Sequence, residues 1–175
     1  IHACWSQAII DRTPQYLEEE SILEASTKGS QSYDDIEVLL KGPDIELPDG
    51  GNFKDKSGIV RNNIRIKWWS SQSSSTYRDI AMVPEGEEDN IPDAFIKASQ
   101  YDFVYSEDSP PVFFGHYWLT GKPRIVRNNL ACLDYSAGID GALVAYHWKA
   151  KDIGKSLRND AFANSVAKSM NGHHV

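Results

Sequence analysis

The chain has 175 residues, of which 41% are hydrophobic, so it can bury the core of one ordinary domain. Its formal net charge of −7 disfavours binding to a nucleic acid duplex, because neutralising the phosphates of a duplex needs clustered Lys and Arg. The sequence has no apolar run of about 18 residues and no basic leader followed by apolar residues, so it predicts no membrane span and a cytoplasmic location.

The first quarter of the chain predicts one strand followed by helices. Residues 1–5 form a short apolar run, which we expect to be a buried strand that carries His2. Residues 6–12 are expected to turn into a short helix. In residues 15–27 apolar side chains recur among acidic ones at the spacing of an amphipathic helix.

A further helix is predicted over residues 32–41, where Ser32 can cap the start and Gly42 stands at the end. Residues 43–58 are rich in Pro, Gly and Asp, and we expect a loop there. Apolar and basic side chains then alternate over residues 64–69, which is the pattern of a strand with one buried face.

The middle of the chain is dominated by loop signals. Residues 70–75 are a polar, serine-rich run that predicts a linker, and residues 84–92 form an acidic surface turn between two prolines. A short helix is predicted between these loops and the later part of the chain, over residues 94–101.

The last third of the chain is predicted to be rich in β structure. Strands are expected over residues 112–116, 130–135 and 142–148, and the glycines of residues 138–141 predict a hairpin between the last two. The apolar residues of the tail, residues 151–170, recur roughly at helical spacing, so we expect a surface helix there.

The segment Pro-Pro-Val-Phe-Phe-Gly-His-Tyr-Trp, residues 110–118, is the most informative stretch. An apolar strand that ends in Gly-His delivers one imidazole to the rim of a sheet, and Gly115 is expected to let the backbone turn sharply there. Imidazole is a common metal ligand, so His116 and His2 together predict part of a metal site. For either residue the alternative is a histidine satisfied by backbone contacts.

These runs, together with Asn-Leu-Ala-Cys-Leu-Asp-Tyr at residues 129–135, resemble the calcineurin-like metallophosphoesterases, in particular the bacterial branch related to diadenosine tetraphosphatases and protein phosphatases. The resemblance covers residues 1–5 and 110–148, with weaker similarity over residues 54–84. In this family a His after a strand and a later Gly-His both ligate the second ion of a dinuclear centre. His2 and His116 match those two positions.

The resemblance implies an α+β fold, the later half of a four-layer α/β/β/α sandwich. Residues 1–175 would then be a single partial domain. Within it, residues 6–109 would be a mixed helical and strand insertion, or cap-like region, between the two histidine motifs. Residues 110–148 would be a β-rich piece of the core, and residues 149–175 a C-terminal helical tail.

The function implied is that of a metal-dependent phosphoesterase, which hydrolyses a phosphoester or phosphoanhydride with metal-activated water. Two divalent ions are expected in the intact enzyme, and Mn, Fe, Zn or Ni all suit a shell of nitrogen and oxygen ligands. The substrate would be a small phosphorylated molecule or a phosphoprotein, with no role for nucleic acid duplexes or membranes.

The family's earlier motifs, Asp-x-His, Gly-Asp-x-x-Asp-Arg-Gly and Gly-Asn-His-Glu, are not in this sequence. We therefore expect a fragment that works with a missing N-terminal half of the same protein and has no catalytic residue of its own. The same observation leaves an alternative open, in which the chain is a degenerate, non-catalytic fold that acts as a binding or interaction module.

Four further residues are candidates for the surroundings of the site. Tyr117 and Trp118 follow the expected ligand and could line its mouth, and Arg65, beside aromatic residues, could hold a substrate phosphate or lie on an ordinary solvent face. Asp134 follows a strand and could orient a ligating histidine, or simply cap the next turn. His147 lies in an apolar run, and we interpret it as structural.

The chain contains two cysteines, Cys4 and Cys132, and both lie in apolar runs. Without a Cys-x-x-Cys pair they do not indicate structural zinc, and we expect two reduced core cysteines.

Overall fold

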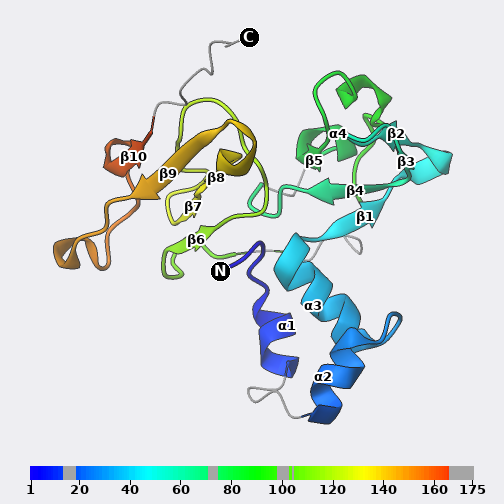
Figure 1. Ribbon diagram of the computed structural model, residues 1–175, viewed down its shortest axis with the longest axis horizontal. Helices are drawn as coiled ribbons and strands as arrows, with labels where there is room; N and C mark the ends of the chain where they lie inside the picture. The colour runs from blue at the N-terminus through cyan, green and yellow to red at the C-terminus, as the bar shows by residue number, and fades with distance from the viewer. Residues whose placement is uncertain (14–18, 71–74, 98–102, 104, 166–175) are drawn as a thin grey trace, which may run out of the picture. The chain divides into compact units, whose positions relative to one another are not determined.

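The computed structural model describes residues 1–13, 19–70, 75–97, 103 and 105–165, and it divides into two compact units (Figure 1). The earlier unit is His2–Tyr105, and the later unit is Ile1 together with Ser106–Val175. Short helices and several small sheets make the chain an α+β protein. None of the helices in the described ranges combines the length and the apolar character that crossing a membrane requires.

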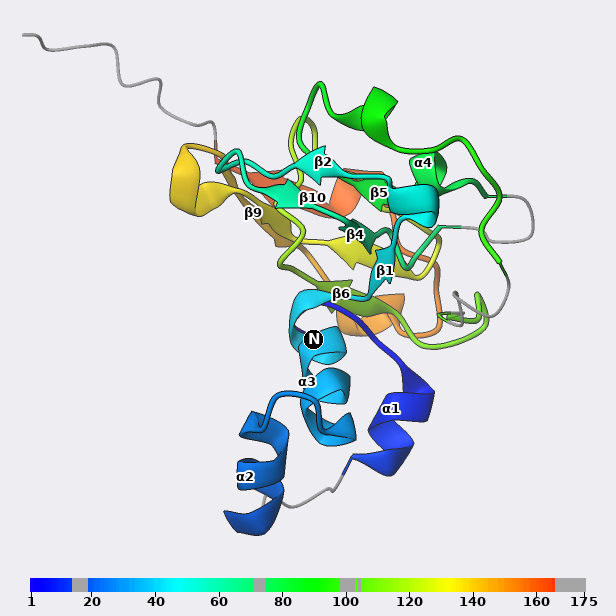
Figure 2. The ribbon, with the colours of Figure 1, turned by 90° about the vertical axis from the view of Figure 1, so that its right-hand side faces the viewer.

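Three helices open the earlier unit: α1 (Gln7–Arg12), α2 (Glu19–Ser26) and α3 (Gln31–Lys41). These confirm the predicted helical segments, although residues 14–18 lie outside the described ranges. Figures 1 and 2 show α2 and α3 side by side, and the two helices contact each other. The cap of α3 is Ser30 rather than the predicted Ser32, because the Ser30 hydroxyl accepts a hydrogen bond from the nitrogen of the third helical residue.

An antiparallel sheet follows, with the order β1 (Asp44–Glu46), β4 (Asn63–Ile66), β5 (Ala81–Met82). A separate hairpin joins β2 (Phe53–Lys54) to β3 (Val60–Arg61). The expected loop over residues 43–58 therefore contains two strands. Each is only two or three residues long, too short for a periodic pattern in the sequence, and each is defined by its pairing with a neighbour.

Short helical turns complete the earlier unit: η1 (Pro48–Gly50), α4 (Tyr77–Ile80) and η2 (Glu88–Asn90). The core of this unit is mainly aliphatic, and β1 and β4 each turn alternate side chains into it. Its buried members come from the sheet, the hairpin, α4 and the loops: Ile45, Leu47, Phe53, Ile64, Ile66, Tyr77, Ile80, Ala81 and Ile91.

Two predicted elements of the earlier unit are wrong. Residues 1–5 do not form a strand. Instead, the nitrogens of Ala3 and Cys4 both donate to the carbonyl of Leu39 near the end of α3. These two bonds fix the segment without strand pairing. The helix predicted over residues 94–101 is wrong in its described part, residues 94–97, since Phe95 forms an isolated antiparallel bridge with Thr76, and residues 98–101 lie outside the described ranges.

The described part of the later unit contains the strands β6 to β10, which are labelled in Figure 1. β6 (Val112–Phe114) pairs in parallel with β7 (Leu130–Cys132), and an antiparallel sheet has the order β10 (Phe162–Asn164), β9 (Ala142–Tyr146), β8 (Asp134–Tyr135). All three residues of β7 are fully buried, so this strand lies in the core of the unit. The strands agree with the predicted segments except for β10.

The predicted hairpin between β8 and β9 is confirmed, with η4 (Ala137–Ile139) in its turn. Gly141 is required there, because a Cβ added at this position would stand 1.9 Å from the carbonyl oxygen of Tyr135. A Cβ added at the neighbouring Gly138 would meet no atom of another part of the chain within 4 Å.

The predicted helix over residues 151–170 is wrong in its described part, up to residue 165. The segment contains η5 (Ala150–Asp152), η6 (Asn159–Ala161) and then β10. A strand forms here because the edge of β9 satisfies the backbone groups of β10, with Phe162 opposite Tyr146.

Candidate functional site

The turn after β6 is the most unusual backbone feature of the later unit. His116 has a φ of 67° and Trp118 a φ of 48°, both in the left-handed region that costs a residue with a Cβ about 1–2 kcal/mol. Gly115, expected to make the sharp turn, is not among the described residues with positive φ. The sharp turn is therefore made by His116 itself, at the carboxyl end of a strand.

Asp134 fastens this turn to β8. Its Oδ2 accepts a hydrogen bond from the nitrogen of Trp118 at 3.3 Å, and its carbonyl accepts one from the nitrogen of Leu119 at 3.0 Å. Its Oδ1 also accepts from the nitrogen of Ser136 at 3.0 Å, so both carboxylate oxygens are engaged. Asp134 thus holds the backbone immediately after His116 by two bonds.

The start of the chain touches the same strand. The backbone nitrogen of Ile1 donates to the carbonyl of Phe113 in β6 at 2.9 Å. His2, the next residue, is exposed and belongs to the earlier unit, whereas His116 is half-buried and belongs to the later unit.

The other candidate residues differ in exposure. Tyr117 is buried and packs edge-on against Phe114, with ring centroids 5.7 Å apart, while Trp118 is 51% exposed. Arg65 lies in β4 of the earlier unit, opposite Asp44, and its Nε is 3.4 Å from an oxygen of that carboxylate. Of the two aromatic candidates, Trp118 is therefore the one with surface to offer a ligand.

Within the ranges that the structure describes, no group of three or more His, Cys, Asp or Glu side chains is placed to hold a metal ion. Each predicted histidine can offer one imidazole nitrogen, a normal donor for a divalent transition metal. By its chemistry each imidazole suits such an ion, and a complete shell would need further ligands.

Both cysteines are buried free thiols, as expected for core residues. Burial raises the pKa of Cys4 to about 12, and burial is also the main reason that the pKa of Cys132 is raised to about 12. Each thiol is therefore neutral at pH 7, which disfavours nucleophilic or metal-ligating chemistry.

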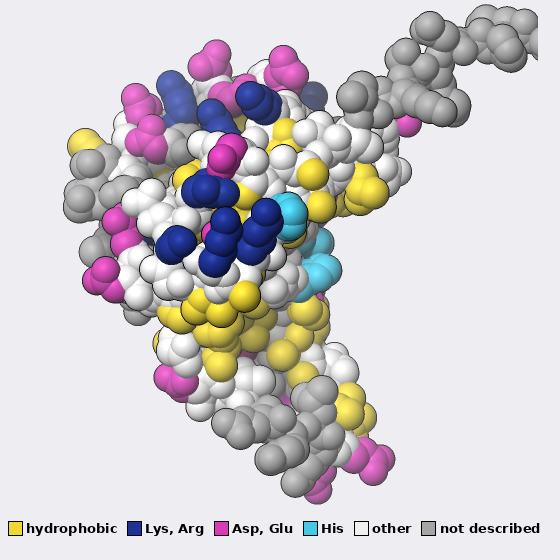
Figure 3. Space-filling view, turned by 90° about the vertical axis from the view of Figure 1, so that its left-hand side faces the viewer, with side chains coloured by type: hydrophobic (Ala, Val, Ile, Leu, Met, Phe, Trp, Pro, Cys, Tyr) yellow, Lys and Arg dark blue, Asp and Glu magenta, His cyan; other side chains and the backbone are white. Residues whose placement is uncertain are grey.

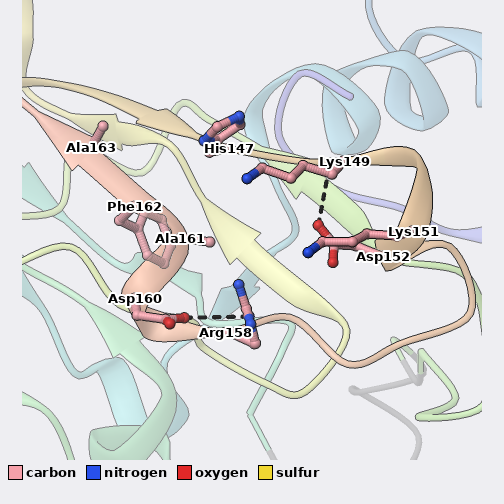
Figure 4. Close-up of a pocket in the computed structure, with 9 residues that line it drawn as sticks. All are labelled: His147, Lys149, Lys151, Asp152, Arg158, Asp160, Ala161, Phe162 and Ala163. Carbon is pink, nitrogen blue, oxygen red and sulfur yellow. Dashed lines mark hydrogen bonds and ion pairs between the residues drawn. The ribbon is translucent and has the colours of Figure 1, made fainter.

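The sequence interpretation missed a basic pocket beside β10 (Figure 4). The pocket is lined by three cations, Lys149, Lys151 and Arg158, together with His147, which had been interpreted as structural. The available signal was the local density of Lys and Arg in an otherwise acidic chain. That signal was lost because the segment was expected to be a surface helix.

Comparison of this chain with family models, with curated proteins and with solved structures gives no match.

Proposed function

We propose that this chain is the later part of a calcineurin-like metal-dependent phosphoesterase, a hydrolase that breaks a phosphoester or phosphoanhydride bond. The sequence resemblance over residues 1–5 and 110–148 is the starting point. The conformation of His116 is the structural observation that carries the proposal.

A histidine with positive φ is strained, and such strain persists where the surrounding structure holds it in place. Here Asp134 supplies that hold through the backbone of Trp118 and Leu119. The turn also follows a strand of a parallel pair, and the carboxyl ends of parallel strands are common places for ligand sites. A ligating role for His116 is supported by its strained backbone, by the hydrogen bonds from the turn to Asp134, and by its place after a parallel strand.

His2 and His116 would each give one imidazole nitrogen to the metal centre. This pairing rests on the sequence resemblance, in which the two histidine motifs contribute to one metal centre. Two divalent ions, chosen among Mn, Fe, Zn and Ni, would supply positive charge to the phosphoryl group and activate a water. Asp134 would act as a positioning residue, since its bonds fix the turn rather than the substrate.

The finer fold assignment is part of the proposal. The later unit would contribute to a four-layer α/β/β/α sandwich, whose completion and remaining metal ligands come from an N-terminal half of the same protein. Residues 6–109 would be the cap-like region between the two histidine motifs. Such a cap would select among small phosphorylated substrates or phosphoproteins. The cytoplasmic location stays a prediction.

Trp118 is our choice for the residue that lines the substrate path, because half of its side chain is exposed next to His116. Tyr117, which is buried, would support the turn from beneath. Arg65 stays a candidate for a phosphate contact, and its Nε is 3.4 Å from a carboxylate oxygen of Asp44.

The test uses the protein expressed from its complete coding sequence. Metal content and hydrolysis of a phosphomonoester and a dinucleoside polyphosphate are measured with added Mn²⁺. His116→Ala is expected to lower turnover by about 100-fold or more and to reduce bound metal, since loss of a direct ligand is at least as costly as loss of its supporting residue. His147→Ala is the control for metal content, which it should leave unchanged.

Near-normal turnover and metal content in His116→Ala would contradict the proposal. If the wild-type protein binds no divalent metal and hydrolyses neither substrate, the alternative stands, namely a degenerate, non-catalytic fold that acts as a binding or interaction module. An Asp134→Asn variant sharpens the result. It keeps one oxygen acceptor but replaces the other with an NH2 group, which cannot accept from a backbone nitrogen. A positioning role predicts a loss of turnover that is smaller than in His116→Ala.

A further inference from the structure

The basic pocket of the later unit is a separate feature from the turn at His116. It encloses a volume of about 240 Å³, and Figure 4 shows its side chains coming from β10, the end of β9 and the loop between them. His147, Lys149 and Lys151 lie on one limb of this loop and Arg158 on the other. Residues up to 16 positions apart in sequence, from His147 to Ala163, thus line one cavity.

Backbone hydrogen bonds hold the two limbs together. The nitrogen of His147 donates to the carbonyl of Ala161 at 2.8 Å, and the nitrogen of Arg158 donates to the hydroxyl of Tyr146 at 2.7 Å. Leu157, only 3% exposed, anchors the returning limb, and its nitrogen donates to the carbonyl of Asn128 at 2.7 Å. These bonds fix the backbone of both limbs, and the exposed side chains of Lys149, Lys151 and Arg158 line the cavity between them.

The pocket has a surplus of positive charge. Three cations face two carboxylates, Asp152 and Asp160, so the net charge is 3 − 2 = +1 with neutral His147, in a chain whose net charge is −7. Asp160 is 3.3 Å from the Nε of Arg158, and Asp152 accepts a hydrogen bond from the backbone nitrogen of Lys149 at 3.0 Å. In the described part of the chain no ion pair is formed by Lys149 or Lys151.

The same concentration of charge is visible on the surface. Figure 3 shows Lys and Arg side chains gathered on the face that bears β9 and β10, with histidine at the edge of the group. Local positive charge of this kind raises the concentration of anions near a surface even when the whole protein is acidic.

We propose that this pocket binds the phosphate group of a small anion. Two ammonium groups, a guanidinium and an imidazole supply several hydrogen bond donors around one cavity, and a phosphate offers oxygens on all sides to accept them. A monovalent carboxylate would use fewer of these donors. The phosphate can be free inorganic phosphate or part of an ester, and the proposal does not depend on the phosphoesterase assignment.

Isothermal titration calorimetry of the full chain at constant ionic strength tests this site, with inorganic phosphate and a nucleoside monophosphate as separate probes. The double variant Lys149→Gln/Lys151→Gln is expected to weaken binding of both probes about tenfold or more, since each lost charge-assisted bond contributes substantially to affinity. The control Lys28→Gln/Lys122→Gln removes the same charge from exposed positions outside the pocket, and it should change the affinity by less than about twofold.

Asp160→Asn provides a change of opposite sign. Its side chain is 74% exposed, so the substitution should leave the fold intact, and it frees Arg158 for the ligand. We expect phosphate to bind about threefold more tightly. Tighter binding of the nucleoside monophosphate than of phosphate would identify an ester as the ligand, and equal binding would identify the free ion as sufficient. Equal losses in the two double variants, or no binding by the wild-type chain, would overturn the proposal.

Discussion

The two units turn their backbones by different means. Among the described residues, the positive φ values of the earlier unit belong to five glycines and a single residue with a side chain, Asp49. The later unit has only two such glycines, and four residues with side chains take the same conformation: His116, Trp118, Ser136 and Asp140.

The two units therefore differ in the steric cost of their turns. Glycine takes a positive φ without a steric penalty, whereas each of the other residues costs about 1–2 kcal/mol. In the later unit the strained residues follow β6 and flank η4. There the Asp134 carboxylate accepts hydrogen bonds from the nitrogens of Trp118 and Ser136, and the Ser136 hydroxyl donates to the carbonyl of Leu119. Strain that is held in this way marks the later unit as the better candidate for a functional site.

The largest expected effect comes from replacing Gly141, the glycine in the hairpin between β8 and β9. Gly141→Ala should destabilise the protein by about 3 kcal/mol, because its Cβ would overlap the carbonyl oxygen of Tyr135 and force the backbone apart. Gly138→Ala, in the same turn, is the control and should change stability by less than about 0.5 kcal/mol. Urea denaturation measures both, and equal effects would show that the hairpin is not constrained.

The next largest effect is expected at Asn129, whose buried side-chain amide bonds to a distant loop of the later unit. The side-chain nitrogen of Asn129 donates to the carbonyls of Ser106 and Ser109 at 2.8 and 3.0 Å. Asn129→Ala should cost about 2 kcal/mol, since two carbonyls lose their donor in a partly buried place. Asn128→Ala removes an exposed amide one residue away and should be nearly neutral. A nearly neutral Asn129→Ala would mean that the two carbonyls find other donors.

The earlier unit offers a matching test with a pH dependence. The guanidinium of Arg12 holds the buried carboxylate of Asp35 by two bonds of 2.6 Å, and this hydrogen bonding lowers the pKa of Asp35. Because the folded pKa lies below the unfolded value of about 3.9, the contribution is present at neutral pH and lost as the pH falls through the lowered pKa. Asp35→Asn should cost about 1.5 kcal/mol at pH 7 and less at low pH.

Asp34→Asn is the control for that measurement, since Asp34 is exposed on the same helix. Its expected cost is a few tenths of a kcal/mol, from the helix dipole alone. Thermal unfolding between pH 7 and pH 2.5 separates the two variants. A loss for Asp35→Asn that is the same at every pH would show that its ionisation does not contribute.

The smallest effect addresses strain at His116 directly. His116→Gly and His116→Ala both remove the imidazole, so their difference isolates the backbone, and the Gly variant should be more stable by about 1 kcal/mol. Lys122 does not have a positive φ, so it serves as the control. There the Ala variant should be more stable than the Gly variant. An Ala variant at least as stable as the Gly variant would remove the evidence for strain at His116.

Much of the secondary structure could be predicted because its signals are local. The helices of the earlier unit have caps and acidic first turns, and the core strands β6 and β7 are short apolar runs. The position of His116 at the end of a strand was also predictable, since the apolar run stops at Gly115. Its left-handed conformation was not, because Gly115 is the residue that ordinarily makes such a turn.

The sequence by itself determined the α+β character, the three opening helices, the hairpin at residues 138–141 and the burial of both cysteines, because caps, turn glycines and apolar runs act over a few residues. Only the tertiary structure decided that residues 162–164 form a strand, that residues 1–5 do not, and that Lys149 and Arg158 share a pocket. Each of these depends on backbone groups from distant segments that satisfy one another, and such pairing leaves no periodic pattern in either segment alone.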